Sequence, residues 1–520
     1  MNNRDAVVMK MRFPKNPYRW PIIVVACILV FYGGSVFLSN YLEGKIEQNI
    51  RSLHGTISSV ELNLFARSIK VNDLEWSSSA NSTNPDPHFL RLSAISATGI
   101  NLYKLMFDKT LHVDDVTIDS GAIQYNKNIK PSGQKVSPSK YKLFSFKNIS
   151  VNNLRAQIQT DTIASVSALL NCRLTDAHIK INAQDSLSYS AKIVEALLEK
   201  ISIGRQEGMY GGTIARLHIN TADQKVVMDS ALLIPNFDKY EFAHRVGEQA
   251  SRVSISVPQL TIEGLQFDKL IDSLFVAATI KITSADLYSF QDKRMAVRKR
   301  NVRLPMEGFL KLPWHIKVDT ILVVDAHLSI EEFPEKGTAS GTITFDSLNA
   351  TLAGLNNRAE ENDNQSASLQ ATALLMGSGR IKALFQFPLD GRSSYTAKGS
   401  IARMPLTKLN GVLEPLANLR IEAGVLHYLV FNFNYTEMAS KGNLDIHYHD
   451  LRLCTTNKRG LFTHGLKTFF VNTIVKNKRI QSKRTAEETG IINIERDRRK
   501  YIFNVWVKSI LGGLKSTIRG

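Results

Sequence analysis

Residues 144–158 read Phe-Ser-Phe-Lys-Asn-Ile-Ser-Val-Asn-Asn-Leu-Arg-Ala-Gln-Ile, and this stretch decides the fold. Apolar and polar residues alternate, as on a strand with one face against a core, but a polar pair twice replaces the single polar residue. Because side chains alternate faces along a strand, each pair would send the following apolar residues to the wrong face. A bulge or bend at each pair restores the face and curves the strand. The stretch therefore predicts a bent strand with one apolar side.

The same pattern, alternating apolar residues interrupted by a two-residue step, recurs along most of the chain, and we call each copy a phrase. Copies lie at residues 111–118, 253–267, 316–330, 343–352 and 444–453. A tight two-residue hairpin is an alternative at any single copy, since Asp114-Asp115 or Asn152-Asn153 would suit one. With either geometry, the phrases predict a mainly β, antiparallel body that is apolar on one face.

An uncharged apolar stretch, residues 21–38, precedes the β region. As a helix it would span roughly 27 Å, close to the ~30 Å of a bilayer core. We therefore predict one transmembrane helix. A cleaved signal peptide is the alternative, although no Ala-x-Ala site follows the stretch. The predicted anchor residues are Pro21, Ile22, Val25, Leu29, Phe31, Phe37 and Leu38.

The flanking charges predict the orientation of this helix. Five basic residues precede it, against the single acidic residue Asp5. The positive-inside bias places residues 1–20 in the cytoplasm as a basic tail, and the bulk of the chain on the other side of the membrane. The five basic residues are Arg4, Lys10, Arg12, Lys15 and Arg19.

The composition limits the partners. The 520 residues include 43% hydrophobic ones, which excludes a largely disordered chain. The net charge of +18 does not predict nucleic acid here, because the predicted topology places the charge outside the cytoplasm. Residues 454–520 alone carry 15 Lys and Arg against 4 Asp and Glu. Such a tail suits anionic lipid headgroups or an acidic partner, and a merely solvated tail is the alternative.

Helical spacing appears at the two ends of the β region. Residues 39–55 predict an amphipathic connector after the anchor, and residues 56–403 form the extended β body. Residues 404–520 form a C-terminal region, in which 404–417 look helical. In the last segment four apolar residues fall on one side of a helix, which either caps the last strands or binds outside the chain, on a membrane surface or a partner. These four are Phe503, Trp506, Ile510 and Leu514.

The motifs of catalysis are missing from the sequence. It has no phosphate-binding glycine loop and no Gly-x-Ser-x-Gly elbow. The best metal candidate is His447-x-His449-Asp450, because two histidines two apart share a strand face, but no third ligand has an obvious spacing. We therefore expect neither an enzyme nor a bound metal or cofactor, and we interpret these histidines as structural or solvent-facing.

Several segments together resemble the AsmA-like family of envelope proteins. The N-terminal part contributes the single anchor and a first hairpin, 59–65 with 69–76. The middle contributes residues 234–242, 287–295 and 349–352, and the C-terminal part 416–424, 447–451 and 503–515. The resemblance implies an elongated, curved antiparallel sheet that forms a U-shaped groove. It also implies an inner-membrane anchor with the bulk of the chain in the periplasm.

The resemblance further implies a function in outer-membrane biogenesis. The groove would bind acyl chains and conduct phospholipid between the envelope membranes, with an outer-membrane or periplasmic protein as a further partner. An anchored, non-enzymatic scaffold or assembly factor for outer-membrane proteins is the alternative. The expected lipid-facing residues are Phe144, Phe146, Ile149, Val151, Val257, Leu260, Ile262, Ile321, Val323 and Phe345.

Overall fold

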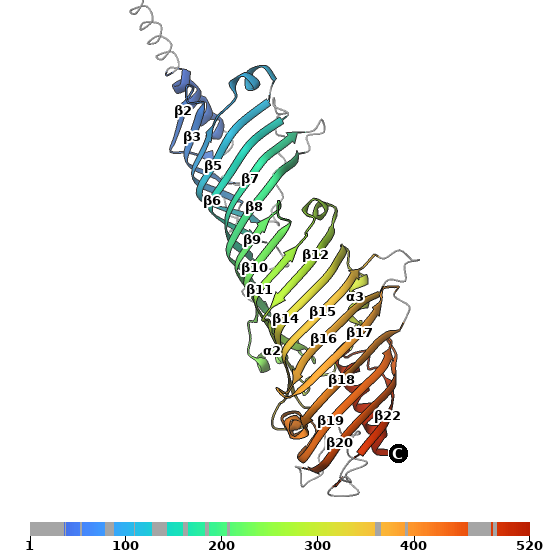
Figure 1. The fold of residues 1–520 in the computed structure, drawn as a ribbon. Helices are drawn as coiled ribbons and strands as arrows, with labels where there is room; N and C mark the ends of the chain where they lie inside the picture. The colour runs from blue at the N-terminus through green and yellow to red at the C-terminus, as the bar shows by residue number, and fades with distance from the viewer. Residues whose placement is uncertain are drawn as a thin grey trace, which may run out of the picture. The chain divides into compact units, whose positions relative to one another are not determined.

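Figure 1 shows the fold of the protein as a computed structural model. It describes residues 36, 38–51, 55–77, 88–108, 110–126, 143–159, 165–181, 187–204, 208–358, 366–390, 394–455, 480–481 and 486–519. The chain divides into two compact units. Unit 1 comprises residues 1–155 and 171–192, and unit 2 comprises residues 156–170 and 193–520.

The fold is mainly β, and its strands belong to one large, mostly antiparallel sheet, which confirms the predicted class. Unit 1 begins with a helix over residues 38–51. The elements that follow it are β1 (Gly55–Thr56), β2 (Ser59–Asn63), β3 (Ser68–Ser77), β4 (Phe89–Thr98), the short helix η1 (Lys104–Asp108) and β5 (Thr110–Asn126). Three further strands contribute residues to both units: β6 (Leu143–Gln159), β7 (Ser165–Ile181) and β8 (Leu187–Gly204).

Unit 2 holds the remaining strands and most of the described helices (Figure 1). Its first half contains β9 (Tyr210–Asn220), β10 (Lys225–Pro235), α2 (Lys239–Val246), β11 (Ser251–Glu263), η2 (Phe267–Asp272), β12 (Leu274–Thr283), β13 (Asp286–Asp292), α3 (Pro305–Leu310) and β14 (His315–Phe333). Its second half contains β15 (Gly341–Asn356), β16 (Ser366–Leu375), β17 (Gly379–Pro388), β18 (Tyr395–Pro405), η3 (Leu406–Leu409), α4 (Asn410–Ala417), β19 (Leu419–Tyr435), β20 (Ala439–Thr455), β21 (Ile480–Gln481), β22 (Ala486–Glu495) and α6 (Ile502–Arg519).

Left-handed residues form the bends that the polar pairs predict. Asn153, Ser347 and Asp450 each occupy the second position of a polar pair, and Asp325 occupies the equivalent step after Val324; their φ values lie between 47° and 52°. Each strand continues through its bend, as β6 does from residue 143 to 159. The bend interpretation is therefore confirmed at these pairs, and the hairpin alternative is wrong there.

In unit 2 these bends line up across neighbouring strands. On each of these strands the run of paired residues skips one position. The skipped positions lie side by side, and we call this row the crease. Four of the residues in the crease, Lys200, Ser230, Ser284 and Asp325, have φ of 50–52°. A left-handed conformation costs a non-glycine residue roughly 1–2 kcal/mol, so neighbouring pairs must hold each bend. In order from β8 to β14 the crease comprises Lys200, Ala215, Ser230, Pro258, Ser284 and Asp325.

The sheet is not wholly antiparallel, which corrects the prediction. Strands β12 and β13 both pair with β14 in parallel, at a constant offset of 41 residues (Leu274 with His315, Asp286 with His327). Parallel pairing needs a long crossover connection, and residues 293–314, which include α3, supply it. In unit 1, β5 and β6 also run alongside each other in the same direction. Three side-chain hydrogen bonds join residues 33 apart: His112 with Ser145, Asp115 with Asn148 and Asp119 with Asn152.

Short helices interrupt the β body earlier than expected. Helical patterns were predicted only at the two ends of the β region, yet α2, η2 and α3 lie between residues 239 and 310. These helices have six to eight residues, too few for an apolar periodicity to show. The predicted helix at 404–417 begins two residues later, as η3 and α4.

Most predicted anchor residues lie outside the described part of the chain, and only Leu38 falls within it. Within the described part, every helix is too short or too polar to cross a bilayer. The transmembrane helix stays a prediction.

Candidate functional site

Unit 2 presents an apolar face and a charged face on the same strands. On the charged face of β8 to β11, ion pairs join neighbouring strands: Arg216 Nε lies 3.7 Å from Asp229 Oδ2, and Lys225 Nζ lies 3.2 Å from Glu263 Oε1. The alternate residues, such as Val226 and Met228 of β10, point the other way and are apolar. The one-faced character that the phrases predict is therefore present in these strands.

Cross-strand pairing arranges the apolar face into three ladders. The first and second ladders lie on one side of the crease, and the third lies on the other side. Met228 pairs with Leu260, and Leu233 with Ile255, so each strand continues the ladder of its neighbour. The first ladder comprises Ala196, Ile219, Val226, Ile262, Ile280, Ile321, Leu352, Leu369 and Phe385; the second Leu198, Leu217, Met228, Leu260, Ile282, Val323 and Ala350; the third Ile203, Gly212, Leu233, Ile255, Leu287, Leu328, Phe345 and Leu375.

The structure brings predicted lipid-facing residues together in these ladders. Ile262 and Ile321 belong to the first ladder, and Leu260 and Val323 to the second. Val257 pairs with Ala231 directly beside the crease. Ile262 and Ile321 are 59 positions apart in sequence, and Leu260 and Val323 are 63 apart. Only the pairing registers show that each pair shares a ladder.

The predicted residues of unit 1 lie on β6. With the offset of 33 residues, Phe144, Phe146, Ile149 and Val151 come alongside residues 111, 113, 116 and 118 of β5. Val151 is buried, whereas the other three are half-buried. Val113 of β5, which lies alongside Phe146, is buried as well, so the apolar side of these two strands is partly enclosed.

The apolar face of unit 2 is half-exposed over β8 to β14. We call the second- and third-ladder residues on these strands the middle apolar face. Ile203 and Leu233 keep 38% and 37% of their surface exposed, and Leu260, Ile282 and Leu328 are half-buried. At one end of the first ladder, η2 covers the face, since Val226, Leu265 and Ala277 are buried with Phe267 and Leu270.

Helices close the same face over the later strands. One buried cluster joins β14 to β22 with α3, α4 and α6, and it includes the first-ladder residues Ile321 and Phe385. Trp506 of α6 stacks on Phe385 with ring centroids 4.3 Å apart, and Phe503 meets Phe345 edge-on at 6.2 Å. The predicted floor residues Ile321 and Phe345 thus pack against protein in this region.

Helix α6 lies directly on strands β20 and β22. Trp506, Ile510 and Leu514, which the sequence placed on one side of a helix, all pack against the buried cluster. Ser509 is completely buried, and its hydroxyl lies 2.6 Å from that of Ser440 on β20. This geometry fits the capping role, the first of the two roles that the sequence left open for the helix.

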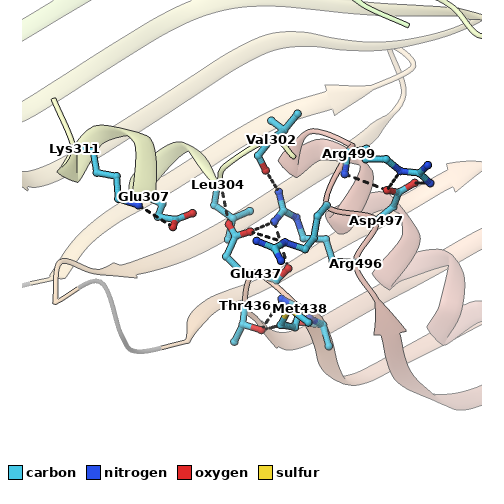
Figure 2. A network of polar contacts seen from close by, with 12 residues as sticks. Val302, Leu304, Glu307, Lys311, Thr436, Glu437, Met438, Arg496, Asp497 and Arg499 are labelled. Atoms are coloured by element: carbon cyan, nitrogen blue, oxygen red, sulfur yellow. Dashed lines mark hydrogen bonds and ion pairs between the residues drawn. The ribbon is translucent and has the colours of Figure 1, made fainter. Parts of the chain in front are cut away.

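A polar network fixes the start of α6 against the chain segment before α3 (Figure 2). Arg496, whose side chain is fully buried, donates to the Glu437 carboxylate and, over 2.6 Å, to the Val302 carbonyl. Glu437 in turn accepts from the backbone N–H of Leu304 at 3.0 Å. We call Val302, Glu437 and Arg496 the clasp. It joins parts of the chain up to 194 residues apart.

A third histidine joins the pair that the sequence singled out. A register shift in the pairing of β19 with β20 inserts His427 between two paired residues. Its ring lies 4.6 Å from that of His447 and 4.7 Å from that of His449 (centroid distances). Desolvation, together with the neighbouring His447, His449 and Arg403, lowers the pKa of His427. The described residues include no cluster of three or more His, Cys, Asp or Glu with the geometry of a metal site.

Comparison with protein-family models gives no match, and comparison with curated proteins gives none at a significant level. Burial against such ladders of aliphatic side chains is favourable for any apolar surface, and the ladder residues carry no acid, base or nucleophile.

Proposed function

We propose that the protein binds phospholipid acyl chains on the middle apolar face and conducts them between envelope membranes, anchored in the inner membrane by residues 21–38. The observation that supports this proposal best is the contrast within unit 2. The second and third ladders are half-exposed over β8 to β14, whereas on the later strands Phe345 packs on Phe503 of α6 and Leu375 is buried in the cluster that the helices cover. A half-exposed aliphatic face of this extent suits a ligand of the same chemistry.

The ladders also suit movement of the ligand. Each buried methylene contributes about 0.8 kcal/mol, so a chain of lipid length would be held firmly. Because successive rungs on β10, β11 and β12 are Met, Leu and Ile, this contribution changes little from one strand to the next. The resemblance to the AsmA-like family supports the same proposal, including the periplasmic location and a protein partner at the outer membrane.

Site-specific photocrosslinking in cells tests the proposal. A photoreactive residue at Leu233 or Leu260 should capture phospholipid. The same residue at Thr261, next to Leu260 but on the charged face, is the matched control and should not. Leu260→Glu should block lipid passage while Thr261→Glu leaves it intact. Protein that is purified under native conditions without phospholipid, and that gives no lipid adduct at Leu233 or Leu260, would contradict the proposal.

The alternative, an anchored scaffold or assembly factor, also has an observation in its favour. Over β16 to β22 the apolar face packs against the chain's own helices, which is what a self-contained binding body requires. Stable complexes with outer-membrane proteins that survive Leu260→Glu would favour this second function.

A further inference from the structure

Unit 1 gathers exposed apolar side chains at one end of its strands. Tyr103, Met106 and Phe107 of the β4–β5 connection expose 68%, 74% and 68% of their surface, and Phe65 of the β2–β3 turn exposes 52%. Tyr41 of the first helix exposes 55%. We call these five residues the rim. Exposed aromatic and thioether side chains in such a group mark an interaction surface.

Backbone hydrogen bonds place the three parts of the rim together. The N–H of Ile100 donates to the carbonyl of Arg67 over 3.1 Å, which sets the β4–β5 connection beside the β2–β3 turn. The N–H of Leu62, just before that turn, donates to Glu43 Oε1 over 2.6 Å, which sets the first helix beside the same turn. The rim therefore occupies a single end of the unit.

This end is also where the chain leaves toward residues 21–38. The C-terminal part of the first helix leads to Gly55, which pairs with Trp76 at the far end of β3. Glu43 lies instead at the β2–β3 turn, so the helix runs from the far end of the hairpin to the rim. Its N-terminal residues, to which the apolar stretch is joined, are thus on the rim side.

The chemistry of the rim suits the boundary between headgroups and acyl chains. Tyr, Phe and Met have apolar bodies that bury in the acyl region, and tyrosine hydroxyls stay at the headgroups. The exposed cations Lys45 and Arg67 flank them and suit lipid phosphates. Lys45 Nζ lies 5.5 Å from the centre of the Tyr41 ring, which keeps a cation at the same level as an aromatic side chain.

We propose that the rim inserts into the membrane leaflet from which the anchor emerges, and so seats the strand ends of unit 1 on the lipid surface. The proposal rests on the proposed anchor and adds a second membrane contact to it. The surrounding bilayer is the single occupant of this surface.

The test uses the full chain in vesicles of phosphatidylethanolamine and phosphatidylglycerol whose acyl chains are brominated. An environment-sensitive fluorescent amino acid replaces Phe107, and in the control it replaces Met438, a 64% exposed residue of unit 2. Both sites are exposed, so folding is preserved, and flotation with the vesicles reports the anchor separately. We expect the bromines to quench the label at 107 and to leave the label at 438 unquenched.

The outcomes separate the two proposals. A chain that floats with the vesicles but is not quenched at 107 overturns the rim and leaves the anchor standing. Equal quenching at 107 and 438 also overturns it, because the insertion would not be specific to the rim. A chain that does not float overturns the anchor and the rim together.

Discussion

Gly490 of β22 and Gly513 of α6 lie in direct contact. A Cβ atom on Gly490 would come within 2.1 Å of the Gly513 carbonyl oxygen. A Cβ on Gly513 would in turn meet the Leu444 side chain at 2.9 Å. The Gly512-Gly513 pair, which lowers helix propensity, is therefore required for the helix to lie this close to the sheet.

This contact predicts opposite effects for two alanine substitutions. Gly490→Ala should destabilise unit 2 by about 1–3 kcal/mol, because neither backbone can move away without opening the buried cluster. Gly308→Ala, in α3, should stabilise by up to about 1 kcal/mol, because nothing lies within 4 Å of its Cβ position. Urea unfolding followed by tryptophan fluorescence measures both, and an equal shift of the two midpoints would contradict the close contact.

The clasp predicts a strong dependence on Arg496. Arg496→Ala should cost about 3 kcal/mol, because it removes the partner of the partly buried Glu437 carboxylate and the donor to Val302. Arg499→Ala is the matched control: its ion pair with Asp497 is 48% exposed on the arginine side, so the unfolding midpoint should hardly change. Thermal unfolding of both variants decides, and similar melting temperatures would show that the clasp does not hold α6.

The crease predicts a residue preference that reverses the usual strand preference. Asp325 has φ 50°, a conformation that valine adopts poorly and glycine freely. Asp325→Val should therefore destabilise by about 1–2 kcal/mol, whereas Asp325→Gly should be nearly neutral. Hydrogen exchange on β14 and β15 reports the local effect. A valine variant as stable as the glycine variant would mean that the strand passes position 325 without its bend.

The histidine cluster predicts a loss of stability in acid. The pKa of His427 is lowered in the folded state, so the unfolded chain binds a proton at His427 more readily. The stability from this group is complete above the unfolded value of about 6.5 and falls as the pH drops through it toward the folded pKa. His427→Asn should flatten this part of the stability curve, and denaturation midpoints between pH 8 and 5 measure it. An unchanged slope in the variant would assign the acid sensitivity elsewhere.

The sequence predicts the local features of this fold well because period and turn chemistry are local. The polar pairs mark the left-handed positions Asn153, Ser347 and Asp450, and the hairpin of β2 and β3 follows from alternation alone. Alternation does not predict the parallel pairing of β12 and β13 with β14. A strand has the same apolar and polar pattern whether its neighbour runs parallel or antiparallel to it.

The candidate site is predicted in part for the same reason. Alternation identifies Phe345 as inward-facing, but its burial depends on what covers it, and Phe503 of α6, which packs against it, is more than 150 residues away in sequence. Likewise His447 and His449 stand out as a pair, while His427 reaches them only through a bulge in β19. The clasp joins Val302, Glu437 and Arg496 across distances for which no sequence pattern exists.

The constant offset between β5 and β6 has a consequence for how such a chain can lengthen. Ser120 and Asn153 are both left-handed and lie 33 residues apart, the same spacing as the hydrogen-bonded pairs of the two strands. A tandem duplication of one such segment would enter the sheet already in register, with its own bend in place. New strands can thus be acquired by copying, without a new core being invented for each.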